Sequence, residues 1–137
     1  MRKSSGNSTV SQKSRLQNRM EAFKHQQRSL KEELWCLGFL MSGSVSKRMI
    51  TCGNSSCACR KDPAARHGPY IYWTTKRKGK TVARLIKNEE AQLYMEWVQN
   101  RKKLDQIIRK WTRLSERTFK TALQLRLMMK KGPKGSP

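Results

Sequence analysis

Apolar residues in the first third of the chain recur at alternating spacings of four and three, the pattern of one stripe along an α-helix. Ser14 precedes the pattern and can cap the free backbone N–H groups of a first turn. Gly38 and Gly43 mark the end of the pattern. The spacing therefore predicts a helix over residues 14–41. Its stripe consists of Leu16, Met20, Phe23, Gln27, Leu30, Leu34, Leu37 and Met41.

A second stripe with the same spacing extends through the C-terminal third. It follows Asn88, whose side chain can cap a helix, and two glutamates whose charge opposes the positive helix end. No proline lies between Asn88 and Pro133, so we expect one long helix over residues 88–131. So long a helix needs a partner, and the first stripe supplies one in an antiparallel helical pair. Threonine replaces apolar residues late in this stripe, so those turns are expected to be free or to pair in a dimer.

Residues 44–87 have the composition of a small β-unit. The run 45–51 is partly β-branched and suits a strand. Residues 70–75 and 81–86 are rich in aromatic and β-branched side chains, and Gly79 lies among basic residues between them. This pattern predicts a β-hairpin with a basic tip. We therefore expect an α+β fold, in which the two long helices form an antiparallel pair with the hairpin unit between them.

Both ends of the chain lack periodicity. Residues 1–13 and 132–137 are rich in small, polar and basic side chains, which predicts two flexible basic tails. No apolar stretch follows the basic start, so it does not resemble a secretory signal. No run approaches the roughly 18 apolar residues of a membrane span. We expect a cytoplasmic, reducing location and no contact with a membrane.

The charge of the chain points to a polyanionic partner. Its 137 residues include 31 Lys and Arg against 9 Asp and Glu, a net charge of +22, and this length suits one small domain with helical extensions. Residues 60–87 contain nine basic side chains against one acidic, residues 101–137 contain twelve against two, and residues 88–100 are acidic. Solvation alone does not explain so large a surplus, and nucleic acid is the first partner to consider.

Three of the four cysteines and one of the two histidines lie within residues 52–67. Cys52, Cys57, Cys59 and His67 supply three thiolates and one imidazole, the ligand set of a closed, tetrahedral, structural Zn²⁺ site. In a reducing compartment, clustered cysteines bind metal more often than they form disulfides. The zinc would replace a hydrophobic core that so small a unit cannot build alone.

Other readings of the cluster stay open. A redox pair of Cys57 and Cys59 would close a strained loop, and an iron–sulfur cluster would need Cys36, which the first helix should place in the core. The fourth ligand could also be a group other than His67. A catalytic zinc needs an open coordination position and a general base, and Asp62 is the one carboxylate in the cluster. No catalytic constellation occurs elsewhere, so we expect no enzyme activity and no small-molecule substrate.

Basic and aromatic side chains around the cluster suit nucleic acid, because cations neutralise phosphates and aromatic rings stack on unpaired bases. Alternate strand residues face opposite sides, so either the tyrosines of the first hairpin strand or its Ile71 and Trp73 must pack on the helices. We expect the basic surface near the zinc to be continuous with the hairpin tip. The candidate contacts in this region are Arg60, Lys61, Arg66, Tyr70, Tyr72, Trp73, Lys76, Arg77, Lys78, Lys80 and Arg84. The candidates on the C-terminal helix are Arg101, Lys102, Lys103, Arg109, Lys110, Arg113 and Arg117.

A set of short motifs carries a family resemblance. The set comprises Gly43-Ser44, Arg48, Cys52-Gly53, Cys57-x-Cys59, His67-Gly68-Pro69-Tyr70 and Gly79-Lys80. Over about residues 42–115 the chain resembles an uncharacterised prokaryotic family of small proteins with this Cys3His pattern. The resemblance implies the same four metal ligands and two turns, one at His67 to Tyr70 and one at Gly79. It implies no activity.

Three functional hypotheses follow from these features. The leading one is a zinc-stabilised basic protein that binds the phosphate backbone of DNA, as an accessory or regulatory factor of a larger nucleic-acid machine. The second is an RNA-binding or ribosome-associated protein. The third is a helical adaptor, or a homodimer, that binds a protein partner through its heptad stripe.

Overall fold

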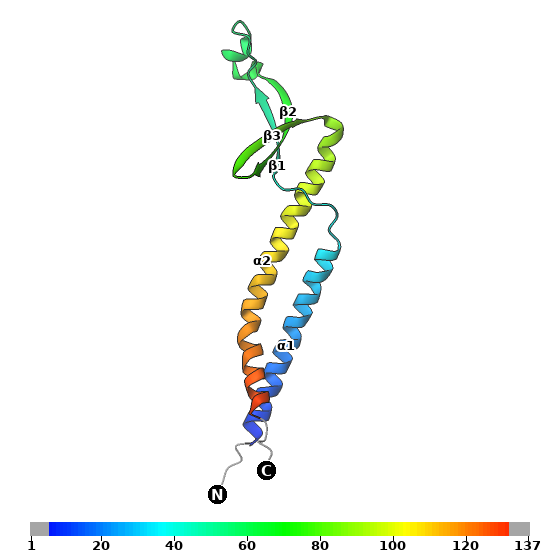
Figure 1. Cartoon of the computed structure of the whole chain (residues 1–137), viewed down its shortest axis with the longest axis vertical. Helices are drawn as coiled ribbons and strands as arrows, with labels where there is room; N and C mark the ends of the chain where they lie inside the picture. Colours follow the sequence, from blue (N-terminus) through cyan, green and yellow to red (C-terminus); the bar gives the residue numbers. More distant parts are fainter. Residues whose placement is uncertain (1–5, 132–137) are drawn as a thin grey trace. The chain divides into compact units, whose positions relative to one another are not determined.

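The computed structural model describes residues 6–131 of the chain, and the side chains from residue 8 onward. The chain divides into two compact units, which we call the helical unit (described residues 6–36 and 105–131) and the sheet unit (residues 37–104). Two helices flank three antiparallel strands, which confirms the expected α+β fold (Figure 1). The elements are α1 (Gly6–Trp35), β1 (Ser44–Ile50), η1 (Ala58–Arg60), η2 (Pro63–Ala65), β2 (His67–Arg77), β3 (Lys80–Ile86) and α2 (Asn88–Lys130).

The helical unit is the predicted antiparallel pair of α1 and the second part of α2 (Figure 1). Its core is the apolar stripe, because Phe23 and Leu30 of α1 are buried together with Ile107 and Leu114 of α2. Thr121 is also buried, with only 2% of its surface exposed. The last turns of α2 are therefore paired within the chain rather than free, contrary to the expectation from their threonines.

The first turns of α1 begin earlier than the sequence indicated. The helix starts at Gly6 rather than at residue 14, so residues 6–13 are helical and Ser14 lies inside the helix. Thr9 and Val10 line a groove together with Met128 of α2, so the additional turns run beside the end of that helix. The remainder of the two predicted tails, residues 1–5 and 132–137, lies outside the described residues.

The end of α1 also differs, because the helix stops at Trp35 instead of continuing to Met41. The following segment belongs to the sheet unit and contacts the first part of α2. The backbone N–H of Met41 donates to the carbonyl oxygen of Trp97 at 3.0 Å, and the side-chain amide of Asn100 donates to the carbonyl oxygen of Phe39 at 3.0 Å. The ring of Phe39 lies 5.2 Å from that of Trp97. These contacts take the place of further helical turns.

The sheet has the order β1-β2-β3, and both pairs are antiparallel. The expected hairpin is β2 with β3, and β1 adds a third strand through pairs such as Val45 with Trp73. One face of the sheet builds the core of the unit, in which Trp73 and Ile86 are buried together with Ala91 and Val98 of α2. The first part of α2 therefore covers one face of the sheet.

The turn between β2 and β3 is the predicted tight turn. Lys78 and Gly79 form its two-residue loop, with φ angles of 50° and 76°. Two successive positive φ angles define the hairpin turn whose twist matches that of the flanking strands, and glycine adopts this conformation without strain. The basic tip is thus a well-defined turn rather than a loose loop.

The start of α2 is stabilised by Glu90. Its carboxylate accepts a hydrogen bond from the backbone N–H of Lys87 at 3.0 Å, and the carbonyl oxygen of Lys87 accepts the first helical bonds. The sequence predicted that Asn88 would cap this helix, whereas the structure gives the role to the glutamate one turn later, as in a capping box. Within residues 6–131, neither helix combines the length and apolarity needed to cross a bilayer.

Candidate metal site and basic surfaces

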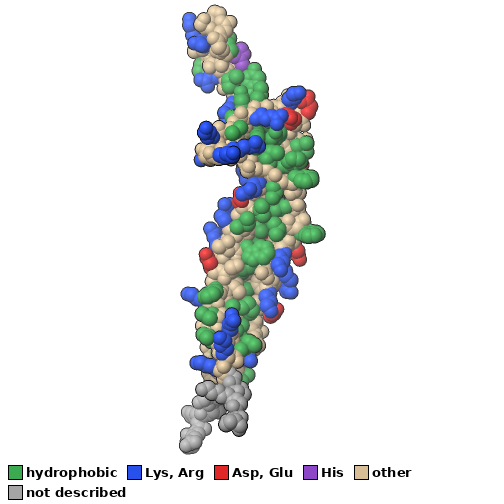
Figure 2. All heavy atoms as spheres, in the orientation of Figure 1, with side chains coloured by type: hydrophobic (Ala, Val, Ile, Leu, Met, Phe, Trp, Pro, Cys, Tyr) green, Lys and Arg blue, Asp and Glu red, His purple; other side chains and the backbone are tan. Residues whose placement is uncertain are grey.

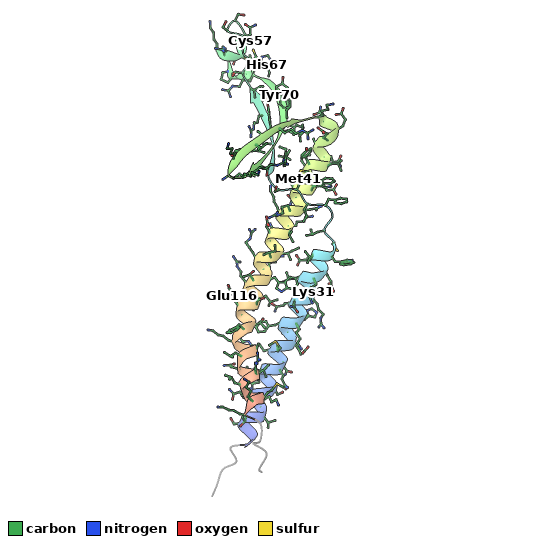
Figure 3. The ribbon with its side chains drawn as sticks, viewed as in Figure 1. Lys31, Met41, Cys57, His67, Tyr70 and Glu116 are labelled. Carbon is green, nitrogen blue, oxygen red and sulfur yellow. The ribbon has the colours of Figure 1, made fainter. Side chains whose placement is uncertain are left out.

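The four predicted metal ligands meet at one end of the sheet, on and beside the loop that joins β1 to β2. Cys52 lies two residues after the end of β1, and His67 is the first residue of β2. Cys57 precedes the short helix η1, and Cys59 lies within it. Figure 3 shows Cys57 and His67 together in this region, with Tyr70 further along β2.

The geometry of the four ligand atoms fits one metal ion. All lie within 4.8 Å of one another. The Sγ atoms of Cys52 and Cys59 are 3.5 Å apart, and Sγ of Cys57 is 3.4 Å from Nε2 of His67. Tetrahedral coordination with metal–sulfur bonds of about 2.3 Å would separate neighbouring sulfurs by roughly 3.8 Å. The side chains could therefore close on an ion with small adjustments.

Local hydrogen bonds shape the loop around these ligands. The backbone N–H of Cys52 donates to Sγ of Cys59 at 3.4 Å, a contact that orients the buried thiol. Oδ1 of Asn54 accepts hydrogen bonds from the backbone N–H and the hydroxyl of Ser56, which tightens the turn between the first two cysteines. Oδ1 of Asp62 accepts from the backbone N–H of Ala64 and caps η2. This carboxylate therefore serves the fold of the loop.

The pKa values of the Cys57 and Cys59 thiols are shifted in opposite directions. The backbone N–H of Cys59 is the main cause that lowers the pKa of Cys57 to about 6, and hydrogen bonds from the Cys59, His67 and Cys52 side chains add to it. For Cys59, the backbone N–H of Cys52 favours the thiolate, but burial and the neighbouring sulfurs outweigh it and raise the pKa. The cluster therefore offers a thiolate at Cys57 at neutral pH, which is the form that binds a metal.

Gly68 fits β2 against β1 beside the cluster. Its φ angle is 125°, and a Cβ atom there would lie 2.8 Å from the carbonyl oxygen of Arg48 and 2.9 Å from the backbone nitrogen of Tyr70. Glycine is the residue that tolerates both this conformation and this proximity. The pairing of β1 with β2 shifts here, so that Ile50 lies opposite His67. The turn expected at His67 to Tyr70 is therefore wrong, because these residues are the first four of β2, and Gly68 lets the strand pass close to β1 beside His67.

The fourth cysteine is separate from the cluster. Cys36 follows α1 in the helical unit and is exposed, so the expectation that it belongs to the core is wrong. Among residues 6–131, the group of side chains that could hold a metal ion comprises Cys52, Cys57, Cys59 and His67, without Cys36. The ligand set remains three cysteines and one histidine.

The basic residues expected to form one surface lie at the two ends of β2. Arg60, Lys61 and Arg66 are exposed in the metal loop, before β2 begins. The exposed cations of the tip lie at the other end, about 30 Å away at roughly 3.3 Å per residue along an 11-residue strand. The two sets are thus separated by the length of the strand, with the exposed Arg48 of β1 between them, and the expected continuity of the basic surface stays a prediction. Figure 2 shows the tip cluster in blue, and its residues are Lys76, Arg77, Lys78 and Lys80.

Trp73 is not available to stack on a base. It is 7% exposed, and its indole N–H donates to the carbonyl oxygen of Ser42 at 2.9 Å. Its ring packs against Tyr94 of α2. Of the two alternating sets on this strand, the core takes the one with Trp73, and the prediction of Trp73 as a nucleic-acid contact is wrong.

Two other predicted contacts also face α2. The guanidinium of Arg84 donates to the hydroxyl of Tyr94 at 3.0 Å and pairs with the carboxylate of Glu90 at 3.2 Å. The guanidinium of Arg77 lies 5.7 Å from the centre of the Trp73 ring. Both side chains thus have partners within the sheet unit, and both remain exposed.

The basic residues of α2 are divided between the two units. In the helical unit, Lys110 pairs with Glu33 at 3.2 Å and the guanidinium of Arg117 lies 5.7 Å from the centre of the Phe23 ring. These two side chains therefore contribute to the helical pair, and Arg109 and Arg113 are exposed. Arg101, Lys102 and Lys103 belong to the sheet unit and are also exposed.

Sequence reasoning did not include Arg48 among the candidate contacts. It lies on β1 opposite Tyr70. Its guanidinium lies 5.0 Å from the centre of the Tyr72 ring and donates to the hydroxyls of Ser46 and Thr74. Alternation indicated only that the two tyrosines share a face, and the pairing of β1 with β2 places Arg48 on that face as well.

The fold and the cluster together define a small α+β protein with a Cys3His group that could hold a metal ion. The chain belongs to the family described as Domain of unknown function (DUF6788), whose model matches residues 20–99. The match includes all four ligands and much of α1, whereas the resemblance in the sequence was expected over residues 42–115. Searches of curated proteins and of solved structures found no match.

Proposed function

We propose that the chain is a zinc-stabilised, non-enzymatic protein that binds nucleic acid through phosphate contacts, with DNA as the first target. It would act as an accessory or regulatory factor of a larger nucleic-acid machine. The observation that carries the proposal is the charge of the exposed side chains around the sheet. Residues 37–87 contain eleven Lys and Arg against a single carboxylate, Asp62, which already caps η2.

Zinc is the metal that suits the ligand set best. Three soft thiolates and one imidazole in near-tetrahedral spacing favour Zn²⁺ over metals that prefer oxygen ligands. Four protein ligands complete the coordination and leave no position for a substrate, which supports a structural role. The metal would close the long loop between Cys52 and His67 and fix the adjoining ends of β1 and β2.

Phosphate contact predicts a steep dependence of affinity on salt, because each neutralised phosphate releases a counterion. The test is fluorescence anisotropy of the zinc-loaded full chain with a labelled DNA duplex. With about six phosphate contacts, raising the salt from about 50 to 200 mM should lower the affinity roughly a thousandfold. Affinity that does not respond to salt, or no binding to either duplex or single-stranded nucleic acid, would contradict the proposal.

Two charge-reversal variants test whether the affinity depends on a local surface or on the overall charge of the chain. Lys76→Glu with Lys78→Glu reverses two cations of the tip, and Lys13→Glu with Lys31→Glu makes the same change of charge on α1. We expect the tip variant to lose at least about tenfold more affinity, because its cations lie on the surface proposed to contact phosphates. Equal losses would mean that only the total charge matters.

RNA is the alternative nucleic acid, and competition between duplex DNA and structured RNA in the same assay distinguishes the two. A protein adaptor is a second candidate function, and one observation favours it. The heptad stripe is used inside the helical pair, but Phe119, Leu123 and Leu127 are exposed at spacings of four on α2. An adaptor would be insensitive to charge reversal at the tip and sensitive to Phe119→Asp.

A further inference from the structure

The sheet has a second face that the core of its unit does not use. In antiparallel pairs, residues opposite each other point to the same side of the sheet. The registers therefore place Tyr70 with Arg48, and Tyr72 with Ser46 and Leu85, on the side opposite to Trp73. We call this side the open face. Tyr70 is 38% exposed and Leu85 53%, and Tyr72 is half-buried.

Arg48 and Tyr72 form a stacked pair on the open face. The guanidinium lies 5.0 Å from the ring centre, and its hydrogen bonds to the hydroxyls of Ser46 at 3.1 Å and Thr74 at 3.3 Å hold it there. Arg48 is exposed, so the outer side of its planar guanidinium faces solvent. Guanidinium planes and aromatic rings are the groups on which proteins stack unpaired bases.

The charge of the sheet complements a nucleic-acid strand. The three strands carry Lys and Arg but no Asp or Glu. The cations of the metal loop lie before β2, and those of the tip follow the open face at its other end. A phosphate backbone that runs along β2 would therefore meet cations at both ends of the strand and aromatic side chains between them.

We propose that the open face binds the unpaired bases of a single-stranded nucleic acid, with Tyr70 and the Arg48–Tyr72 pair as stacking platforms. This inference rests on the proposed function and adds its substrate class. A base pair inside a duplex hides both base faces in the helix stack, so a stacking platform discriminates in favour of single strands. The cations at the two ends then supply affinity without reading sequence.

The test compares binding of the zinc-loaded full chain to oligodeoxyuridylate, oligouridylate and a DNA duplex of equal charge. Tyr70→Leu keeps an apolar side chain but removes the ring, and Arg48→Lys keeps the charge but removes the plane. Trp35→Leu is the control, since it removes a 90% exposed aromatic ring that lies outside the sheet unit. Zinc content and circular dichroism establish that each variant is folded.

We expect Tyr70→Leu and Arg48→Lys each to weaken single-strand binding roughly tenfold, since stacking on one base is worth about 1 to 3 kcal/mol. Binding to the duplex should stay within about twofold, and Trp35→Leu should change neither. Equal losses on single strand and duplex, or no loss, would overturn the inference. A wild-type protein that binds only duplex would also overturn it while leaving the proposed function intact, and one that binds no nucleic acid would refute both. Preference for one of the two single strands supports the inference and identifies the sugar.

Discussion

The helical unit and the sheet unit are stabilised by different means. In the helical unit, apolar residues on two long helices bury one another, and Phe23, Leu30, Ile107 and Leu114 form a conventional stripe. The sheet unit has a buried cluster at the side of α2, but its far end consists of turns around Cys59, the one buried residue between Thr51 and Arg66. A core of side chains suffices where two helices can be long. A loop of that size would gain its stability from the proposed metal.

The largest expected effect comes from removing the metal or a ligand. Cys59→Ser, or a strong chelator, should disorder the metal loop and loosen the adjoining ends of β1 and β2, because structural zinc contributes about 10 kcal/mol or more. Helix α1 should be unaffected, since its core contains no ligand. Hydrogen exchange measured by mass spectrometry, peptide by peptide, checks both halves of this expectation. Cys36→Ser is the control and should change nothing, whereas equal loosening of both units would show that they are not independent.

The converse variant acts on the helical unit. Leu114→Ala removes most of a side chain that is 6% exposed, and should lower the free energy of unfolding by about 2 to 5 kcal/mol. Zinc content should stay at one ion per chain, because the ligands lie in the other unit. Thermal unfolding followed by circular dichroism gives the first value and metal analysis the second. Leu123→Ala, at a 44% exposed position, should cost less than about 1 kcal/mol, and a larger loss there would contradict the assigned core.

A smaller effect is the pH dependence that the Cys57 thiol should give to the stability of the sheet unit. In the metal-free protein the pKa of Cys57 is lowered from an ordinary value of 9.0 to about 6. A thiol with a lowered pKa stabilises the folded state fully above about pH 9, and this contribution is lost as the pH falls toward 6. Alkylation of Cys57, mapped by mass spectrometry, should be half-maximal near pH 6 in the folded chain and near pH 9 in denaturant. The same midpoint in both states would show that the loop hydrogen bonds are not formed without metal.

Much of the fold followed from the sequence because periodicity is a local property. The two stripes predicted the helical pair, and the β-branched runs with Gly79 predicted the hairpin and its turn. Where the structure differs from these predictions, contacts between segments far apart in the sequence determine the local structure. The end of α1 at Trp35 depends on Phe39 and Met41 meeting Trp97, and nothing within residues 14–41 contains that information.

The candidate site was also predicted from the sequence only in part. The spacing of the residues in the sequence was enough to predict the four candidate metal ligands. The structure places their ligand atoms close enough together to hold one ion. The basic surface could not be predicted to the same degree, because exposure depends on which face of a strand the core uses. Alternation showed that Trp73 and Tyr72 point to opposite sides, but only the packing of α2 decides which is buried. For the same reason Arg48 acquired its place beside Tyr72 only through strand register.

Helix α2 has a consequence for how the chain folds. This unbroken helix has 43 residues. Its first part belongs to the sheet unit and its second part to the helical unit. Starting a helix is the slow and unfavourable step, whereas each added residue is gained quickly once a first turn exists. A nucleus formed in either unit can therefore extend into the other, so that the unit folding first provides its neighbour with a ready-made template.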